Sequence, residues 1–546
     1  MTPSRPLAPS IPRETSPPRP LWPAALGVGM IALILYTLTA APGLLWGDSA
    51  AFALRVWRGE LNNPLGLALA HPLYIILARG FTWLLPGDFA WRVNLFSALC
   101  GAAALPLMYV AAARLTGRSF AAWVAVLLLA LSHTYWTHAV IAEVYSLYAL
   151  GLAAELCLLE RFVRTRRRGW LNAALFINGL GICNHLLALL HLPGYLLLAA
   201  GMSRRGEWRW RGAAPPLIFW LVGCSLYLAM IAGRLAAGDD PVSVLREALT
   251  GRQYARNMTG SGFTVRGDAL KTAAAFLMNF PTPLLLFAIP GALALLRRPA
   301  VFPSSHEGAG SSFPPFQGGT QGGSPPLSPV SRRVTQWMLA LIAIDFAFGF
   351  IYTVPDKYVF FFPCYVLLPL LAAAGAASWA DRRARRALII LLALLPALVY
   401  EVAPPLLSRR NVGLSGVRDL PGRDKYSYFF RPRKNGITGA APAAAAALRH
   451  VGPGGLLLAD STVKAALVYL REAGGISRDV LLAEEGDPIP RPPAAPCSVE
   501  NIRRFVAAGR CYLFDATPGY VLPDWIARDY ALVPDGPIYR VTPRPG

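Results

Sequence analysis

Long apolar stretches recur along this chain as far as about Leu407, and they constrain its fold more than any other feature. A helix needs roughly 17–25 consecutive apolar residues to cross the ~30 Å of hydrocarbon in a bilayer. The 546 residues are 55% hydrophobic and only 15% charged, which is too apolar for an ordinary soluble domain. We therefore predict a polytopic α-helical membrane protein with about eleven spans, near residues 23–44, 91–112, 119–137, 145–162, 170–183, 186–203, 214–233, 272–296, 335–353, 358–379 and 387–405.

The positive charge of the chain is distributed unevenly between its loops. A net charge of +22 would fit a nucleic-acid-binding protein if the basic residues formed one face of a soluble fold. Instead, arginines gather in alternate loops between spans, as at 161–168, 204–211 and 382–386. Because such clusters stay on the cytoplasmic side of a membrane, the sequence predicts a cytoplasmic N-terminus, an extracytoplasmic C-terminal part and no nucleic-acid partner.

Three regions differ in composition from the apolar body. Residues 1–22 are rich in proline and arginine and predict a disordered cytoplasmic tail. Residues 299–331 are rich in Gly, Ser and Pro and predict a cytoplasmic linker within a membrane domain that covers 23–407. From 408 to 546, strand patterns at 454–461, 479–485 and 511–516 alternate with helix patterns at 462–475 and 502–509, which predicts a small extracytoplasmic α/β domain.

One apolar segment, at 64–86, does not read as a span. Pro72 and Arg79 interrupt it, and counting it as a span would move every later loop to the other side of the membrane. We therefore expect it to form a helix that lies along the outer membrane interface.

Ionisable residues gather in the loops that are predicted to face outward. Asp48 directly follows the first span, and Glu143 interrupts an apolar stretch. His185 stands at one hairpin tip, and Asp356 with Lys357 at another. Ionisable residues at such depth usually face a polar cavity, so we expect these side chains to line one cavity at the outer surface. The alternative is that they are solvated loop residues, since hairpin tips are polar by necessity.

Two further outer-loop residues are candidates to contact a substrate. His71 precedes Pro72, and Arg252 offers a planar guanidinium of the kind that binds phosphate well. An exposed loop arginine is the alternative for Arg252. No pair of histidines has the spacing of a known metal-binding motif, so we predict no metal site.

Short motifs follow one another in a fixed order along most of residues 40–480. They are Gly47-Asp48-Ser49, His71-Pro72-Leu73-Tyr74, Trp91-Arg92-Val93-Asn94-Leu95 with Ser97-Ala98-Leu99, Ala142-Glu143-Val144-Tyr145, Asn184-His185, Thr250-Gly251-Arg252-Gln253-Tyr254, Pro355-Asp356 and Arg423-Asp424. Each motif is weak alone, but the ordered series resembles a large family of bacterial membrane proteins, long known only as a domain of unknown function, that includes an animal protein O-mannosyltransferase. That family in turn resembles the GT-C superfamily of membrane glycosyltransferases.

The resemblance implies a GT-C-like fold in a bacterial inner membrane and assigns roles to individual residues. GT-C enzymes share an acidic residue in the first outer loop and take sugars from lipid-phosphate donors. Asp48 corresponds to that acidic residue. The complete set of expected site residues is Asp48 and Glu143 as catalytic groups, with His71, His185, Arg252, Asp356 and Lys357 as substrate-binding groups.

The expected reaction is an inverting transfer of a sugar from a polyprenyl-phosphate donor. Asp48 would accept the proton of an acceptor hydroxyl while that oxygen attacks the anomeric carbon and polyprenyl phosphate leaves. Arginine alone can stabilise a departing phosphate, so no cofactor or metal is required. Mannose and a protein acceptor follow only from the animal relative. No tetratricopeptide tail like that of the family follows the domain, which leaves protein and glycan acceptors open.

A transporter or flippase for lipid-linked sugars is the main alternative from another class. Such a protein would also place polar groups among membrane spans. It should show paired broken helices and internal repeats, and the sequence indicates neither. In both cases the expected partners are membrane lipids and a lipid-linked sugar.

Overall fold

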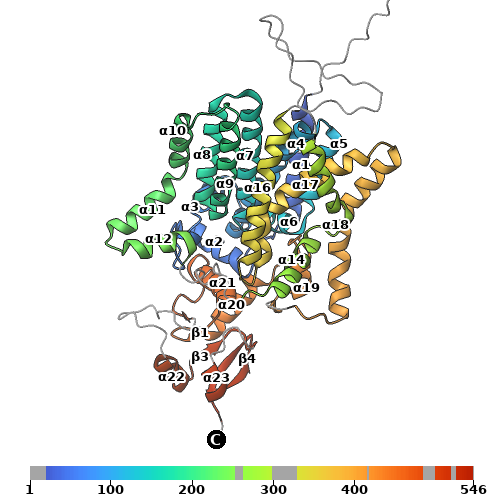
Figure 1. Cartoon of the computed structure of the whole chain (residues 1–546). Coiled ribbons are helices and arrows are strands. Elements are labelled where there is room, and N and C mark those ends of the chain that lie inside the picture. The colour runs from blue at the N-terminus through green and yellow to red at the C-terminus, as the bar shows by residue number, and fades with distance from the viewer. Residues whose placement is uncertain are drawn as a thin grey trace, which may run out of the picture.

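The computed structural model describes residues 20–251, 262–297, 329–414, 417–483, 499–517 and 524–544. Arg252, most of the predicted tail and most of the predicted linker lie outside these residues. A large helical body forms the first part of the chain, and a smaller unit that contains a β-sheet lies at one end of it (Figure 1).

The helical body runs from α1 to α18. Its first half contains α1 (Leu21–Thr39), α2 (Asp48–Arg58), η1 (Leu67–Leu69), α3 (Pro72–Thr82), α4 (Phe89–Thr116), α5 (Ser119–Ala130), α6 (His133–Ala139), α7 (Tyr145–Thr165), α8 (Arg168–Asn184), η2 (Leu186–His191) and α9 (Leu192–Ser203). Its second half contains η3 (Trp210–Gly212), α10 (Ala214–Gly223), α11 (Ser225–Ala236), α12 (Pro241–Thr250), α14 (Val265–Asn279), η4 (Pro283–Phe287), α15 (Ala288–Arg297), α16 (Pro329–Ile351), η5 (Lys357–Phe361), α17 (Phe362–Trp379) and α18 (Arg383–Arg409).

The predicted class of a polytopic helical membrane protein is confirmed. By length and composition, the described part of the chain contains six helices able to cross a membrane, or nine spans if each of three bent helix pairs is counted as one. Two of the eleven predicted spans are not among these nine, and they correspond to α7 and α8. The α7 helix carries several charged side chains and α8 has 17 residues, so neither resembles a simple lipid-facing span. Within the bundle, the buried Glu155 of α7 accepts a hydrogen bond from Tyr195 at 2.9 Å.

The bends in three spans are the main departure from the expected helices. The angle between α5 and α6 is 68°, between α10 and α11 it is 67°, and between α14 and α15 it is 106°. The segment expected to lie at the membrane interface forms the short helices η1 and α3, and neither is long enough to span a bilayer.

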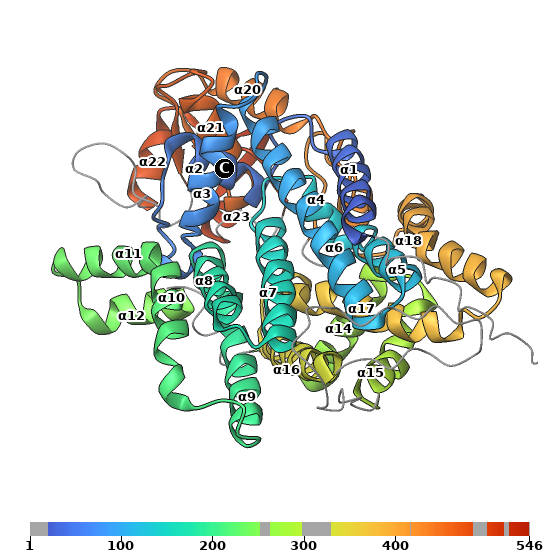
Figure 2. The same cartoon turned by 90° about the horizontal axis from the view of Figure 1, so that it is seen from above.

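The longest described helix, α4, lies near the centre of the bundle. It packs against α1 on one side and α7 on the other, and α8 then packs between α7 and α10 (Figure 2). Elsewhere α15 packs closely on α17, because a Cβ atom at Gly291 would lie only 1.8 Å from the carbonyl oxygen of Leu371. Small residues permit such close helix contacts in membranes.

The C-terminal part folds as the predicted small α/β unit. It contains α19 (Lys425–Phe430), α20 (Ala440–Val451), β1 (Leu456–Leu458), α21 (Ser461–Glu472), β2 (Leu481–Ala483), α22 (Val499–Ala507), β3 (Cys511–Leu513), α23 (Asp524–Asp529), β4 (Tyr530–Asp535) and β5 (Ile538–Pro543). The strand order is β2-β1-β3-β5-β4, in which β1 runs parallel to β2 and β3 while β5 runs antiparallel to β3 and β4. The sequence analysis identified the first three strands and missed the β4–β5 hairpin.

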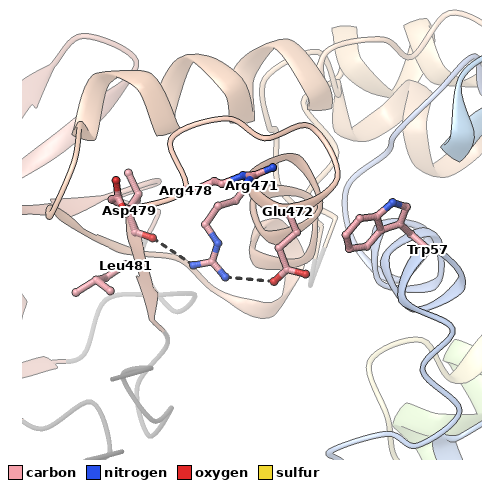
Figure 3. Close-up of a pocket in the computed structure, with 7 residues that line it drawn as sticks. Trp57, Arg471, Glu472, Arg478, Asp479 and Leu481 are labelled. Carbon is pink, nitrogen blue, oxygen red and sulfur yellow. Dashed lines mark hydrogen bonds and ion pairs between the residues drawn. The ribbon is translucent and has the colours of Figure 1, made fainter. Parts of the chain in front are cut away.

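The C-terminal unit packs directly against α2. Arg58 at the end of α2 pairs with Glu472 of α21 through two contacts of 2.8 and 2.6 Å. Beside this ion pair lies a pocket of about 430 Å³ between the two parts of the chain. Figure 3 shows Trp57 of α2 on one side of this pocket and Arg471, Glu472 and Arg478 on the other. The junction therefore fixes the helix that begins at Asp48 against the C-terminal unit.

Candidate active site

Asp48 is the first residue of α2, and its backbone is anchored on the C-terminal unit. The indole Nε1 of Trp46 donates to the carbonyl of Pro421 at 3.1 Å. The backbone N–H of Gly47 donates to the carbonyl of Thr462 at 2.7 Å. Gly47 has a φ of 79° and a ψ of −147°, a conformation that glycine adopts readily and other residues rarely do. These contacts set the position of Asp48 relative to the C-terminal unit.

Three carboxylates meet at this point. Asp48 and Asp356 are both exposed to solvent. The protein around Asp48 still displaces part of the water near its carboxylate, and this desolvation raises the pKa of Asp48. Burial, together with the charge of Asp48, raises the pKa of Asp356 to about 6. The pKa of Glu143 is raised well above its usual range, first by burial and then by the charges of Asp48 and Asp356. The three carboxylates therefore lie near one another, on loops that the sequence predicted to face the same side.

Asn94 of α4 holds the two loops that carry the carboxylates. Its side-chain amide donates to the carbonyls of Ala41 and Gly43, both at 3.0 Å, in the segment that leads to Asp48. Its Oδ1 accepts from the backbone N–H of Ala142 at 2.8 Å, directly before Glu143. Because Asn94 is fully buried, these bonds fix the distance between the two loops.

Ser97 supports Glu143 one helical turn farther along α4. Its hydroxyl oxygen accepts from the backbone N–H of Glu143 at 3.2 Å and lies 3.1 Å from the hydroxyl of Tyr74 in α3. Asn94 and Ser97 both fall within motifs singled out in the sequence, although neither was predicted as a site residue.

The two predicted histidines, His71 and His185, lie side by side. The rings of His71 and His185 stack with centroids 5.3 Å apart, and Tyr145 follows at 5.1 Å from His185. Burial lowers the pKa of His71 well below its usual value, so the ring is neutral, and its Nδ1 lies 2.6 Å from the carbonyl of Asn184. Nδ1 therefore carries the proton and Nε2 is an acceptor. His185 accepts at Nδ1 from Leu187, so its neutral form offers an Nε2–H donor.

The two predicted cations have different outcomes. Lys357 is buried, and its ammonium lies 2.8 Å from a carboxylate oxygen of Asp268 and 2.5 Å from the carbonyl of Phe350. The carboxylate of Asp268 in α14 thus already neutralises the charge of Lys357. Arg252 lies outside the described residues, so its predicted contact with phosphate stays a prediction.

The C-terminal unit contributes two residues, Tyr428 and Arg423, that were not predicted from the sequence as site residues. Burial raises the pKa of Tyr428 in α19. The charge of Arg423 lowers this pKa, and the charges of Asp48 and Glu143 raise it. Arg423 lies over the ring of Tyr428, 4.1 Å from its centroid. The motif Arg423-Asp424 was the only sequence signal that this segment lies near the carboxylates.

The chemistry available here comes from acids, neutral hydrogen-bonding groups and one guanidinium. Asp48 can accept a proton, a protonated Glu143 can donate a hydrogen bond, and the paired histidines can orient hydroxyl groups. In the part of the chain that the structure describes, no group of three or more His, Cys, Asp or Glu side chains is placed to hold a metal ion.

Comparisons with known proteins show which proteins this chain resembles. Residues 67–206 match the family model described as the protein O-mannosyl-transferase TMEM260 N-terminal domain. The mouse protein O-mannosyl-transferase TMEM260 is 31% identical over 155 residues, a stretch that spans 28% of this chain and 22% of the mouse protein. The matched family segment contains His71, Asn94, Glu143 and His185, whereas Asp48 lies before it.

Two solved structures share the fold over nearly the whole chain. Both are ArnT from Cupriavidus metallidurans, at 14% sequence identity. The apo form gives a TM-score of 0.57 and covers 95% of this chain and 96% of ArnT. The form bound to undecaprenyl phosphate gives 0.55, with 95% and 97% covered. The chain is thus an integral membrane protein that shares the fold of ArnT, and its residues 67–206 resemble the N-terminal domain of the protein O-mannosyl-transferase TMEM260 family.

Proposed function

We propose that this protein is a glycosyltransferase that moves a sugar from a polyprenyl-phosphate donor to an acceptor outside the cytoplasm. The observation that carries the proposal is the position of Asp48, an exposed carboxylate that lies near Glu143 and Asp356. The likeness in fold to ArnT bound to undecaprenyl phosphate supports the donor class.

In the proposed reaction Asp48 acts as the general base. It accepts the proton of an acceptor hydroxyl while the hydroxyl oxygen forms a bond to the anomeric carbon. The bond between that carbon and the phosphate oxygen breaks, and polyprenyl phosphate leaves with the electron pair, which inverts the anomeric configuration. Glu143 keeps its proton next to the ionised Asp48 and donates a hydrogen bond to a substrate hydroxyl, since two adjacent carboxylates with separated pKa values take different roles.

The proposal extends to the place and the partners of the reaction. The arginine-rich loops orient the N-terminus toward the cytoplasm, which puts Asp48 and the C-terminal unit on the outer side of a bacterial inner membrane. Mannose as the sugar and a protein as the acceptor rest on the resemblance to the TMEM260 relatives. No cofactor or metal is required, because the leaving phosphate can be stabilised by a guanidinium.

The donor class is tested with membranes that contain the wild-type protein. A panel of radiolabelled polyprenyl-phosphate sugars and of nucleotide sugars is offered together with an extract of outer-membrane and periplasmic acceptors. We expect label to leave one lipid-linked donor and to appear on an acceptor, with no transfer from nucleotide sugars. Movement of intact lipid-linked sugar across the bilayer without transfer would identify a flippase instead, a class for which the bent helix pairs leave structural room.

The pH dependence of transfer is expected to show the raised pKa of Asp48. A general base works only when ionised, so kcat/KM should fall as pH is lowered through that pKa, at a higher pH than for an ordinary aspartate. Asp356→Asn should leave this acid limb in place, because burial, and not the charge of Asp356, raises the pKa of Asp48. The measurement is the pH profile of kcat/KM for both proteins. A wild-type acid limb at the pH of an ordinary aspartate, or a limb that moves with Asp356→Asn, would contradict this account.

A further inference from the structure

Negative charge around Asp48 is an obstacle that the proposed reaction must overcome. The ionised Asp48 lies near Asp356, and a polyprenyl-phosphate donor is itself an anion, whereas Glu143 keeps its proton. The leaving group gains further negative charge as the bond to the sugar breaks. Like charges at close range repel each other strongly in a desolvated site, so a cation must lie beside the same carboxylates. This inference rests on the proposed function.

Arg423 is placed beside the cavity by a tight turn. The backbone atoms of Leu420 and Arg423 exchange two hydrogen bonds, of 3.0 and 2.8 Å, around Pro421 and Gly422. Gly422 has a φ of 67° and a Cβ atom there would lie 2.2 Å from Cα of Gly439, so glycine is required. Because the carbonyl of Pro421 accepts the bond from Trp46, this turn is tied to the loop of Asp48.

The guanidinium of Arg423 is partly buried and lacks an anionic partner. It stacks on Tyr428 with its Cζ 4.1 Å from the ring centroid. Its Nε is fully buried and has no hydrogen-bond partner among the described residues, and no described carboxylate forms an ion pair with it. The same tyrosine lies within electrostatic reach of Asp48 and Glu143. Arg423 therefore lies close to the carboxylates, on the ring of Tyr428.

The other described cations near the carboxylates already have hydrogen-bond or ion-pair partners. Lys434 is buried under the same tyrosine, and its ammonium donates to the carbonyls of Tyr428 at 2.6 Å and Arg431 at 2.5 Å. It therefore stabilises the segment that carries Arg423. Lys357 forms its ion pair with Asp268. Of the basic side chains described next to the carboxylates, Arg423 is the one with hydrogen-bond donors left to offer.

We propose that Arg423 binds the phosphate group of the donor lipid and of the polyprenyl phosphate that leaves. A guanidinium presents several N–H groups in a fixed plane, which matches the oxygens of a phosphate. Stacking on Tyr428 holds this plane in place before the lipid arrives. The C-terminal unit thereby supplies the phosphate-binding group, while the membrane helices supply the base.

The test measures binding of undecaprenyl phosphate and of uncharged undecaprenol to the purified full-length protein in lipid nanodiscs. The variants are Arg423→Gln, Arg423→Lys and, as a matched control, Arg478→Gln. Arg478 is an exposed arginine of the C-terminal unit that lines the separate pocket in Figure 3. We expect Arg423→Gln to weaken binding of undecaprenyl phosphate by about tenfold or more and to leave undecaprenol unchanged. Arg423→Lys should lie between, and Arg478→Gln should match wild type.

Each other outcome overturns the assignment. Equal binding of undecaprenyl phosphate by wild type and Arg423→Gln would show that Arg423 does not contact phosphate. Equal loss of both lipids in all Arg423 variants would show a structural residue only. If the wild type itself does not prefer undecaprenyl phosphate to undecaprenol, the assignment fails with the donor class. An Asp48→Asn protein that binds undecaprenyl phosphate like wild type but transfers no sugar separates the two failures, because it tests the base alone.

Discussion

Replacing Asp48 by asparagine is expected to reduce the rate of sugar transfer by about 10²–10⁴-fold, the usual contribution of a positioned general base. Asparagine has nearly the shape of aspartate, so the contacts of Trp46 and Gly47 with the C-terminal unit should persist. The amide cannot accept the proton of the acceptor hydroxyl, so kcat should fall while the affinity for the donor changes little. The measurement is single-turnover transfer from a labelled polyprenyl-phosphate sugar.

A matched carboxylate on the same helical body provides the control for this variant. Asp381→Asn changes an exposed residue whose ion pair with Arg385 lies on the other side of the bundle, among the predicted cytoplasmic arginines. Surface ion pairs contribute little, so transfer by this protein should equal that of wild type. Full turnover by Asp48→Asn in the same assay would rule out Asp48 as the base.

Asn94→Leu is expected to lower both stability and turnover, although Asn94 touches no substrate. The substitution removes three hydrogen bonds and leaves the carbonyls of Ala41 and Gly43 and the N–H of Ala142 without this partner. Each carbonyl left unsatisfied costs about 1–3 kcal/mol, whereas the N–H of Ala142 keeps its hydrogen bond to Ser49 Oγ at 3.2 Å. A shift of ~1 Å between the loops of Asp48 and Glu143 can reduce kcat about 10²-fold. Thermal unfolding in detergent and kcat are measured on the same preparation.

Another asparagine distinguishes a local effect from a general one. Asn172 of α8 is partly buried and its Oδ1 has no hydrogen-bond partner among the described residues. Asn172→Leu should therefore leave kcat unchanged. If Asn94→Leu retained wild-type kcat and melting temperature, the account of how the two carboxylate loops are held together would be wrong.

The sequence contained most of what determines the membrane body and the position of its acidic residues. Each predicted span coincides with one helix or one bent pair, because a bilayer imposes its thickness on the length of apolar segments. Asp48, Glu143 and Asp356 meet because hairpin tips on one side of a helical bundle converge. Hydropathy alone was sufficient for this, since it sets which loops share a side.

What the sequence could not predict depends on contacts between distant segments. Lys357 pairs with Asp268, 89 residues away, and nothing local indicates that this lysine is neutralised. Arg423 reaches the cavity only because the chain after the last span folds back on Trp46, 375 residues from its partner Pro421. The β4–β5 hairpin is a different case, because its two-residue loop Gly536-Pro537, with glycine first, is a recognised hairpin-turn signal that could have identified it.

The central claim, that this protein transfers a sugar from a polyprenyl-phosphate donor, is tested most directly by stoichiometry. Purified wild-type protein is placed in liposomes with one donor that carries different labels on its sugar and its lipid, and the acceptor is supplied on the side of the C-terminal unit. The account predicts one molecule of polyprenyl phosphate released for each sugar that reaches the acceptor. Sugar and lipid labels that stay together on the donor, whether or not it crosses the bilayer, would contradict it.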